Sequence, residues 1–416
     1  MKVLYVNLRR ILKNTTAGGE LHIVDLIKGF KGNNIDCYIC YPHGGKICVL
    51  DWNANKEYEY IGFSSVNIFG NNVIEENFRK IIKDFSIDII HFQNFQTFPL
   101  SLLEIAKEEG KKIVMTIHDY FLWCDNYTLL SPAYDRNKLS FCFFEKRPEI
   151  CSMCLTSLAF QPNSADYVRQ RREYINGLLQ MVDGFIFPSE YPKSALLSLY
   201  GNVAESKCEV IEHGINKMLM QGYEQYIGNK PHLNLAFLGA FRKAKGSDSF
   251  LSLIEYLKHK RDIKFFIFGR IEDTISTAHE NLCLLGEYNR NHLPSLLREH
   301  QIDVILLLSP WPETYSYTLT EAIISGVPVI STDLGALRER VSKHFAGWLV
   351  PCENPLQKII TIIDGIIHNK EVLAFFKKKL YKSSEMIPTL EEMSKKYVEF
   401  YDKLYVENTA GFPLEG

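Results

Sequence analysis

Two glutamates separated by seven residues, Glu313 and Glu321, mark the segment in which chemistry is most strongly indicated. Glu313 follows an apolar run, and Glu321 lies in a predicted helix that begins near Ser316. The first amides of a helix are free to donate and lie at the positive end of its dipole, so the amides of Ser316, Tyr317 and Thr318 suit a phosphate. The carboxylates on either side suit hydroxyls of the same ligand. A simple capping role is the alternative for either glutamate.

A glycine-rich basic loop lies earlier in the same half of the chain. Gly239 and Gly246 enclose three cations, Arg242, Lys243 and Lys245. Glycines let the backbone approach a ligand closely, and the cations neutralise charge, so this loop suits a diphosphate. A solvated basic turn is an equally good explanation of the loop alone.

Two weaker features lie in the first half of the chain. Gly18 and Gly19 open a predicted helix, where free amides favour a phosphate, but the three-glycine pattern of a dinucleotide-binding loop is missing. His118 ends an apolar run, and an imidazole there can donate to a sugar hydroxyl or move a proton near neutral pH. A plain loop and a structural histidine are the more common outcomes for such isolated features.

The elements that must position these residues alternate between short apolar runs and longer amphipathic stretches, as in parallel sheets covered by helices. Two such units of about 200 residues are indicated, with a boundary at residues 216–232. Since ligands of open parallel sheets sit beyond the carboxyl ends of the strands, the loops after the strands should hold the site. The candidate strands are Val3–Asn7, Cys37–Tyr41, Ile87–Phe92, Ile113–His118, Phe185–Pro188, Glu209–Glu212, Leu233–Leu238, Lys264–Gly269, Val304–Leu308 and Val327–Ile330.

The overall composition excludes several classes of protein. The 416 residues carry 47 basic and 49 acidic side chains, so the formal charge of −2 argues against a nucleic-acid coat protein. No apolar run reaches the ~18 residues of a membrane-spanning helix, and the N-terminus is charged too early for a signal peptide. We therefore expect a cytoplasmic protein without nucleic acid as a partner.

Taken together and in this order, these features resemble the family-4-type glycosyltransferases of the retaining, GT-B-fold class. The Gly-Gly loop, the His-Asp pair at His118, the Gly-x5-Lys-Gly loop at Lys245, the Glu-x7-Glu segment and a final helix all occur in the family order. The resemblance implies an α/β GT-B fold in which two Rossmann-like domains face each other across a cleft. An acceptor domain would cover residues 1–215, a linker 216–232 and a nucleotide-sugar-binding domain 233–388.

The last helix is predicted independently of the resemblance. Apolar side chains recur every three or four residues in Leu390–Glu407, which gives one apolar stripe. By its own pattern this helix can cover either unit. The resemblance implies that residues 389–408 cross back to the N-terminal domain.

The resemblance also assigns roles in donor binding. Lys245, assisted by Arg242, would neutralise the diphosphate, and Glu321 would accept hydrogen bonds from the ribose. Glu313 would contact the donor sugar, with Ser316 and Tyr317 nearby.

Further contacts are implied elsewhere in the chain. Gly18 and Gly19 would close on the diphosphate, and His118 would contact the sugar near the reacting carbon. The base would lie near Gly286 and Tyr288. This chain departs from the family in having Ala240 where the phosphate loop often has Arg, and Ser316 where the family usually has Gly.

The implied chemistry is transfer of a sugar from a nucleoside diphosphate to a glycan or lipid-linked acceptor, with retention of configuration. Cleavage builds negative charge on the leaving diphosphate, which cations and helix amides stabilise. No Asp-x-Asp occurs in the sequence, which agrees with catalysis that needs no metal. Bacterial surface polysaccharide synthesis is the expected setting.

Three other functions are weighed against transfer. A dehydrogenase lacks its three-glycine loop here, and a GT-B-like sugar epimerase would not explain Glu313 and Glu321 as well. A noncatalytic scaffold in a glycan-assembly complex would not need Lys245 and His118.

Two basic segments raise the question of membrane contact. Arg169, Arg171 and Arg172 can touch an anionic lipid surface, although a solvated helix face is the simpler explanation. Residues 377–379 with Lys382 are expected to be a surface feature.

Four of the ten cysteines gather in a segment directly after His118: Cys124, Cys142, Cys151 and Cys154. A Cys-x2-Cys pair with two further thiols can complete a tetrahedral sulfur site, so a structural zinc in this insertion, residues 120–165, is the hypothesis. An iron–sulfur cluster and free thiols are the alternatives. The other six cysteines are scattered, and most should pack as small apolar side chains.

Overall fold

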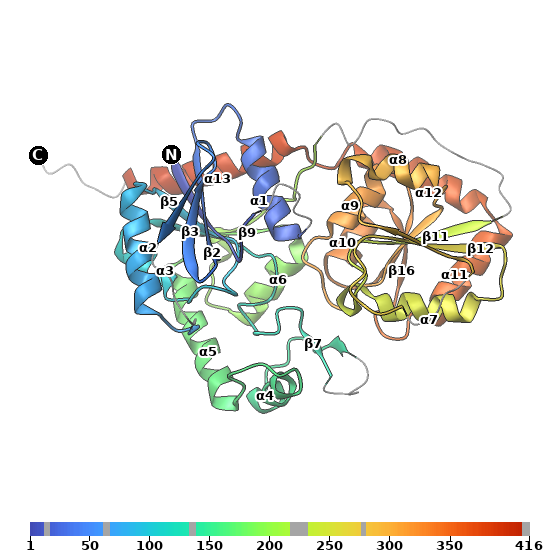
Figure 1. The fold of residues 1–416 in the computed structure, drawn as a ribbon, viewed down its shortest axis with the longest axis horizontal. Helices are drawn as coiled ribbons and strands as arrows, with labels where there is room; N and C mark the ends of the chain where they lie inside the picture. Colours follow the sequence, from blue (N-terminus) through green and yellow to red (C-terminus); the bar gives the residue numbers. More distant parts are fainter. Residues whose placement is uncertain (12–16, 61–66, 133–138, 217–231, 276–279, 410–416) are drawn as a thin grey trace, which may run out of the picture. The chain divides into compact units, whose positions relative to one another are not determined.

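The computed structural model describes the chain except for residues 12–16, 61–66, 133–138, 217–231, 276–279 and 410–416. The chain folds into two compact units, which are described separately (Figure 1). Unit 1 consists of Met1–Tyr127, Phe144–Gly214 and Thr389–Gly416, and unit 2 of Thr128–Phe143 and Ile215–Pro388. The expected linker, residues 216–232, lies almost wholly outside the described residues.

Unit 1 is built on an eight-stranded sheet in the order β10-β9-β6-β5-β1-β2-β3-β4. All pairs are parallel except the antiparallel β2–β3 and β3–β4 pairs at one edge. The strands are β1 (Lys2–Val6), β2 (Asp36–His43), β3 (Lys46–Asp51), β4 (Lys56–Tyr60), β5 (Ile89–Phe92), β6 (Lys112–Thr116), β9 (Gly184–Phe187) and β10 (Cys208–Val210). The helices are α1 (Gly18–Gly29), α2 (Asn72–Asp84), α3 (Leu102–Glu108), α4 (Pro148–Ser157), α5 (Ala165–Leu178), α6 (Glu190–Leu199) and α13 (Leu390–Thr409).

Unit 2 holds a six-stranded parallel sheet in the order β13-β12-β11-β14-β15-β16, the strand order of a Rossmann fold. The strands are β11 (Leu233–Leu238), β12 (Ile263–Phe268), β13 (Leu282–Gly286), β14 (Val304–Leu307), β15 (Val329–Thr332) and β16 (Gly347–Val350). The helices are α7 (Ser247–Leu257), α8 (Leu293–Glu299), α9 (Tyr317–Ile324), α10 (Gly335–His344), α11 (Leu356–His368) and α12 (Glu371–Ser384). A short hairpin, β7 (Leu130–Ser131) and β8 (Ser140–Phe141), is separate from both sheets.

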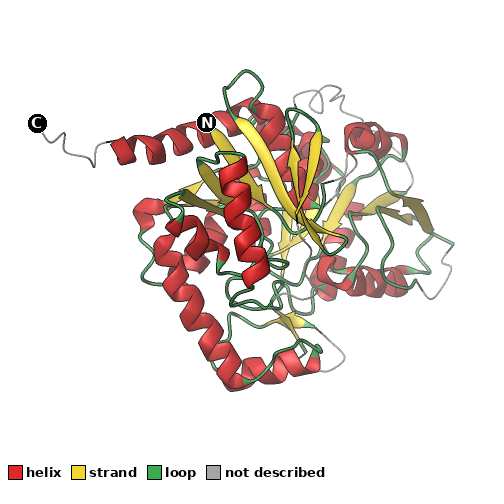
Figure 2. Ribbon diagram, turned by 60° about the vertical axis from the view of Figure 1, so that its left-hand side comes forward, coloured by secondary structure: helices red, strands yellow, loops and turns green. Residues whose placement is uncertain are grey.

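Helices cover both faces of the unit 2 sheet, as the ribbon in Figure 2 shows. One apolar cluster joins the sheet to α8, α9 and α10, and a second joins it to α7 and α11. Because both faces are buried, β11 and β14 have no exposed residue. This is why the central strands read as continuous apolar runs in the sequence.

Each of the ten candidate strands overlaps an observed strand, which confirms the predicted α/β architecture. Several strands were not among the candidates. β4, for example, reads Lys-Glu-Tyr-Glu-Tyr and has no buried residue, so it lacks the apolar pattern of the central strands. An edge position next to solvent permits such a composition.

The final helix α13 packs on unit 1, although it follows unit 2 in the chain. Its buried side chains Tyr397, Phe400 and Tyr401 join the core formed by β1, β2 and α1. The backbone of unit 1 approaches the helix closely at Gly184, where a Cβ would lie 2.4 Å from Cζ of Phe400. The predicted return of this helix to the first unit is therefore confirmed.

Helix α10 ends in an unusual way. Phe345, directly after the last helical residue, has φ 48° and ψ 44°, the left-handed conformation in which glycine is favoured. For a residue with a Cβ this conformation costs roughly 1–2 kcal/mol.

No helix in the described part of the chain is long and apolar enough to cross a lipid bilayer.

Gly184→Ala tests the close contact of α13 with unit 1. The added methyl would force Phe400 to move, so we expect the free energy of unfolding to fall by about 1–3 kcal/mol in urea denaturation. Gly177→Ala is the matched control, because a Cβ there meets no atom within 4 Å and the residue lies inside α5. It should raise stability by about 0.5–1 kcal/mol. Equal effects of the two variants would contradict the tight contact.

Candidate active site

The predicted donor-site residues of unit 2 gather at the carboxyl ends of β11 and β14. The order of the strands reverses between these two neighbours, and this switch point is where Rossmann folds bind ligands. Lys245 lies in the 3₁₀ turn after β11, and Glu313 lies in the loop after β14. Lys245 Nζ is 2.9 Å from Glu313 Oε2. The other carboxylate oxygen of the buried Glu313 accepts a hydrogen bond from Ser309.

A glycine at position 246 allows the basic loop to sit this close. Gly246 has φ 89°, and a Cβ there would lie 2.2 Å from the carbonyl oxygen of Leu308 at the end of β14. Gly239, with φ 106°, lies against Thr318 of α9. Positive φ and the lack of a side chain thus bring the basic loop against the start of α9.

Glu321 faces a different loop, the one after β13. Tyr288 donates a hydrogen bond of 3.0 Å to Glu321 Oε2, and Arg290 Nε lies 3.1 Å from Oε1. The Arg290 guanidinium also lies 4.7 Å above the ring of Tyr317. Burial and the nearby carboxylate raise the pKa of Tyr288, so its hydroxyl remains a donor at neutral pH. Arg290 was not among the predicted residues, because one arginine in a polar loop carries no recognisable pattern.

The N-terminus of α9 is held by a buried arginine that the sequence gives no reason to select. Arg340 of α10 donates to the carbonyl oxygens of Tyr315 and Ser316 at 3.1 and 3.0 Å, and to the Thr320 hydroxyl at 2.8 Å. Its guanidinium stacks 3.8 Å from the ring centroid of Tyr315. These contacts fix the peptide groups that precede the helix.

Ser316 caps α9 in a strained conformation. Its hydroxyl accepts a hydrogen bond from the amide of Leu319, while its φ is 78°. The predicted helix start at Ser316 is thus observed, and the residue occupies a conformation that favours glycine.

The remaining predicted residues of unit 2 lie at the same end of the sheet. Arg242 follows β11, and its Nη1 is 3.9 Å from Glu272. Gly286 ends β13 with φ 71°, and its carbonyl accepts from Gly269 at the end of β12. Arg242 thus lies beside Glu272, while Lys245 pairs with Glu313.

In unit 1, Gly18 and Gly19 begin α1 as predicted, and Gly19 lies beside His118. A Cβ on Gly19 would be 3.9 Å from the His118 ring. His118 follows β6, and its Nε2 is 2.7 Å from Oε1 of the buried Gln93 after β5. The Gly-Gly loop and the histidine are thus brought together at the carboxyl ends of the strands.

Three imidazoles cluster around this point. His22 of α1 stacks on His213 with ring centroids 4.1 Å apart, and its centroid is 5.2 Å from that of His118. His22 Nε2 is 3.0 Å from the hydroxyl of Tyr397, so α13 supports the cluster. Burial lowers the pKa of His118 to about 4 and holds that of His22 well below its usual value. His22 and His118 are therefore neutral at pH 7.

The hydrogen-bond network continues under the cluster. Buried His91 is 2.8 Å from the hydroxyl of Thr116 through Nε2, and 2.6 Å from that of Tyr401 through Nδ1. Burial holds the pKa of His91 well below its usual value too. Next to His118, burial raises the pKa of Asp119 to about 6, although Asn94 and Gln96 donate to its carboxylate.

The three arginines of α5 differ in exposure, and each has contacts within unit 1. Arg171 is buried, with Nε 3.1 Å from Asp125. The Arg172 guanidinium lies 3.9 Å from the ring centroid of Trp123, and Arg169 pairs with Glu149 and Asp166. Arg171 is buried because α5 packs against the segment that follows His118, whereas Arg169 and its carboxylate partners lie at the surface.

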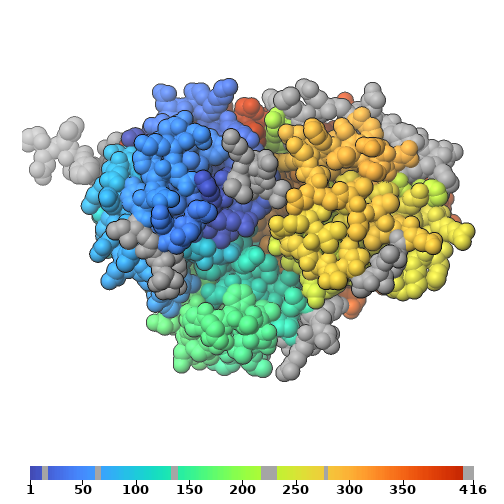
Figure 3. Space-filling view, viewed as in Figure 1, coloured from blue at the N-terminus to red at the C-terminus, as the bar shows by residue number. Residues whose placement is uncertain are grey.

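None of the four cysteines of this segment forms a disulfide; three of them belong to unit 1, and Cys142 belongs to unit 2. Cys151 and Cys154 are one turn apart on α4, Cys124 packs on the same apolar cluster as Cys151, and Cys142 directly follows β8. Arg172 donates to Cys151 Sγ at 3.2 Å. The outer side of this segment faces solvent in Figure 3.

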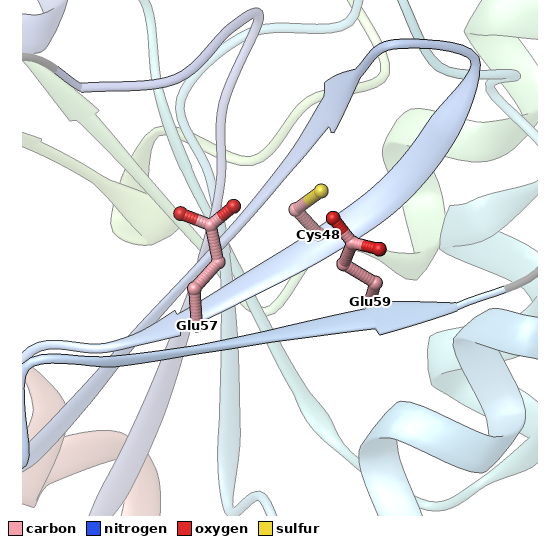
Figure 4. Close-up of side chains that lie close together, drawn as sticks. All are labelled: Cys48, Glu57 and Glu59. Atoms are coloured by element: carbon pink, nitrogen blue, oxygen red, sulfur yellow. The ribbon is translucent and has the colours of Figure 1, made fainter.

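One group in the described chain has metal-ligand atoms within 4.8 Å of one another: Cys48 of β3 with Glu57 and Glu59 of β4 (Figure 4). Glu57 already pairs with Arg10 at 2.7 Å, and Glu59 pairs with Lys46. Because each carboxylate has a cation beside it, the charges of this group are balanced by the protein alone.

Family models match both units. The model described as "Glycosyl transferases group 1" matches residues 227–383, and that described as "Glycosyltransferase Family 4" matches residues 16–217. The chain belongs to the group 1 glycosyltransferases. The motif at Glu313 and Glu321 and the loop at Lys245 lie within the first match, and Gly18, Gly19 and His118 lie within the second.

Two curated relatives are named for polysaccharide genes or synthesis. An uncharacterized 41.2 kDa protein in the cps region of Klebsiella pneumoniae is 30% identical over 178 residues, which is 40% of this chain and 48% of that protein. The putative colanic acid biosynthesis glycosyl transferase WcaC of Escherichia coli is 23% identical over 81% of each chain. The chain thus spans about half of the first relative and most of the second.

Solved structures confirm the GT-B fold. Anabaena Alr3699/HepE in complex with UDP matches with a TM-score of 0.64 and 13% identity over 97% of this chain and 100% of that one. Sucrose-phosphate synthase from Thermosynechococcus elongatus matches with a TM-score of 0.67 and 12% identity over 98% and 99%. At this identity the similarity establishes the fold alone.

Ser316 provides a test of strain at the helix start. Ser316→Gly removes the strained conformation at little cost in capping, so the free energy of unfolding should rise by about 1 kcal/mol. Ser316→Ala keeps the strain and removes the cap, and should lower it by about 1 kcal/mol. Urea denaturation of both variants measures the difference. If glycine destabilised as much as alanine, strain at this position would be refuted.

The neutral histidines predict how stability depends on pH. Between about pH 6.5 and 4, unfolded imidazoles bind protons that folded His22, His91 and His118 do not, so the free energy of unfolding falls as the pH falls. Asp119 acts in the opposite direction between about pH 4 and 6, because its folded pKa is raised. The one proton bound by folded Asp119 is outweighed by the three protons that the unfolded imidazoles of His22, His91 and His118 bind.

Urea denaturation near pH 7 and near pH 5 should therefore show lower stability at the acidic pH. In His118→Gln the decrease should be smaller by up to about 1.4 kcal/mol per pH unit, the contribution of one proton. An unchanged slope in this variant would mean that His118 is not held neutral by the fold.

Proposed function

We propose that this protein transfers a glycosyl group from a nucleoside diphosphate sugar to a glycan or lipid-linked acceptor, with retention of configuration and without a catalytic metal. The observation that supports this most strongly is the joining of Lys245 and Glu313 at the switch point of unit 2, beside the N-terminus of α9. One cation, one carboxylate and a row of helix amides there suit a ligand with both phosphate and hydroxyl groups.

The donor would be bound by cations at its diphosphate and by carboxylates at its sugar and ribose hydroxyls. The diphosphate would accept hydrogen bonds from Lys245 and the first amides of α9, with Arg242 as a second cation. Glu313 would then accept hydrogen bonds from hydroxyls of the sugar, and Glu321 from those of the ribose. Tyr288 and Arg290, which contact Glu321, support placing the base near the loop after β13.

The reaction would proceed by breaking the bond between the anomeric carbon and the diphosphate oxygen. The leaving oxygen gains negative charge, and Lys245 and the α9 amides stabilise it. The same oxygen takes the proton of the acceptor hydroxyl while that hydroxyl bonds to the anomeric carbon from the same face. Protons and bonds therefore balance without a further reactant.

His118, Gly18 and Gly19 would complete donor binding from unit 1. A neutral imidazole exchanges hydrogen bonds with sugar hydroxyls without adding charge near the sugar, where positive charge develops. The pKa of about 4 supports this role of His118 over that of a cation for the phosphate.

The setting would be synthesis of a bacterial surface polysaccharide. The names of the two relatives, a protein of a cps region and a putative colanic acid glycosyl transferase, support this assignment. A lipid-linked acceptor would place the enzyme at a membrane surface.

Cys124, Cys142, Cys151 and Cys154 would hold a structural zinc. The Cys-x2-Cys pair one turn apart on α4 supports this proposal, but no three of these four described thiols lie within 4.8 Å of one another, so zinc would have to draw them together. Metal analysis of the purified protein, compared with Cys151→Ser/Cys154→Ser, tests it: one zinc lost in the variant supports the site. Iron in place of zinc, or no metal at all, would refute it.

Kinetics on a panel of nucleotide sugars test the function. Lys245→Met should lower kcat/KM about 10²–10³-fold, because it removes the positive charge beside the leaving diphosphate.

Glu321→Gln should weaken binding of the matching nucleoside diphosphate about tenfold in calorimetry, a loss of about 1.4 kcal/mol in binding free energy. Lys258→Met is the control, since this lysine pairs with Glu255 on the exposed side of α7.

Retention is tested separately, by the anomeric configuration of the first-formed product in NMR. Inversion would refute the proposed mechanism while leaving transfer intact. Nucleotide binding without turnover of any donor would instead assign a noncatalytic role, and absence of both would refute donor binding altogether.

A further inference from the structure

An exposed face of α12 combines lysines with aromatic rings. Phe375, Lys378, Lys379 and Lys382 follow one another at helical spacings of three, one and three residues, so they share one side of the helix. All four are exposed, and Phe345 at the end of α10 lies beside them. Lys379 Nζ is 5.4 Å from the ring centroid of Phe345 and 5.5 Å from that of Phe375. We call these five residues the α12 face.

The aromatic side chains of the α12 face are unusually open to solvent. Phe345 is 60% exposed and Phe375 is 53% exposed. Neighbouring Trp348 and Phe376, by contrast, pack together with ring centroids 4.4 Å apart. Two exposed phenylalanines joined by one lysine form a small apolar patch, and such patches on a surface commonly mark an interaction site.

The backbone at Phe345 is a second and independent observation. The residue stands in the left-handed conformation at the end of α10, where glycine is the favoured residue. A phenylalanine here strains the backbone and leaves most of its ring in water. The folded state would gain from a glycine, so the exposed ring requires a reason outside the folding of unit 2.

The charged side chains of the α12 face are all lysines. Within the described chain, no carboxylate lies within 4.0 Å of the ammonium groups of Lys378, Lys379 or Lys382. Glu371 begins the helix and is at the opposite end from Lys382, and Glu385 follows the helix. Unpaired ammonium groups on long stems, flanked by aromatic rings, match the boundary between lipid headgroups and acyl chains.

We propose that the α12 face binds an anionic lipid surface, with Phe345 and Phe375 in the headgroup region and the three lysines on lipid phosphates. An ordered protein partner would be expected to pair these cations with fixed carboxylates around a shaped pocket, whereas a bilayer requires only charge and a few aromatic rings. The inference goes beyond glycosyl transfer, and its test does not depend on any donor.

Co-sedimentation of the full chain with vesicles tests the proposal. Vesicles of phosphatidylglycerol and phosphatidylcholine should bind the protein, vesicles of phosphatidylcholine alone should not, and salt should weaken binding. Phe345→Gly should bind about tenfold more weakly, yet its Tm should rise by about 2 °C because the backbone strain is gone. Lys378→Gln and Lys382→Gln should each weaken binding about fivefold.

Tyr256→Ser is the matched control, because Tyr256 is an aromatic residue 58% exposed on α7. It should leave vesicle binding unchanged. Absence of phosphatidylglycerol-dependent binding, or equal binding by Phe345→Gly, would overturn the proposal. Sedimentation equilibrium that shows a dimer dissolved by Phe345→Gly would also overturn it, since the α12 face would then bind a second copy of the chain.

Discussion

A carboxylate buried in a protein needs a partner, and in unit 2 this requirement joins the two loops of the switch point. Glu313 is 5% exposed, and the ammonium group of Lys245 compensates its charge at 2.9 Å. The pair can form only because Gly246 lets the basic loop pass against Leu308. A local ion pair therefore depends on backbone conformation, and the ion pair in turn holds the loop after β11 against the loop after β14.

The two units solve the problem of buried polar groups differently. Unit 2 uses charged side chains: Arg340 donates hydrogen bonds to backbone carbonyl oxygens, and Arg290 forms an ion pair with Glu321. Unit 1 uses neutral groups, where His22, His91 and His118 are held uncharged by burial. A transferase needs both environments, because charge that would stabilise the leaving diphosphate would oppose the positive charge that develops on the sugar.

Most of the fold could be predicted from the sequence, and so could part of the candidate site. Buried parallel strands are continuously apolar, and the motifs that follow them keep fixed spacings, so the central strands could be predicted, together with the places of Lys245, Glu313 and His118 at their carboxyl ends. Arg340, Arg290 and His22 could not, because their roles arise from contacts between segments far apart in the chain. The strand β4 was missed for a related reason, since its polar composition is allowed only by its place at the edge of a sheet. Patterns along a chain report burial and local geometry, and they do not report which distant atoms meet.

The return of α13 to unit 1 has a consequence for how the protein is made. Tyr397 meets His22 across 375 residues of chain, and the core of unit 1 is incomplete without Tyr397, Phe400 and Tyr401. A ribosome synthesises residues in order, so the first unit must wait, unfinished, until the second has been synthesised in full. A polypeptide truncated before Leu390 would lack its last helix and, with it, the contact of Tyr397 with His22 beside His118. The core of unit 1 is thus completed among the last steps in making the protein.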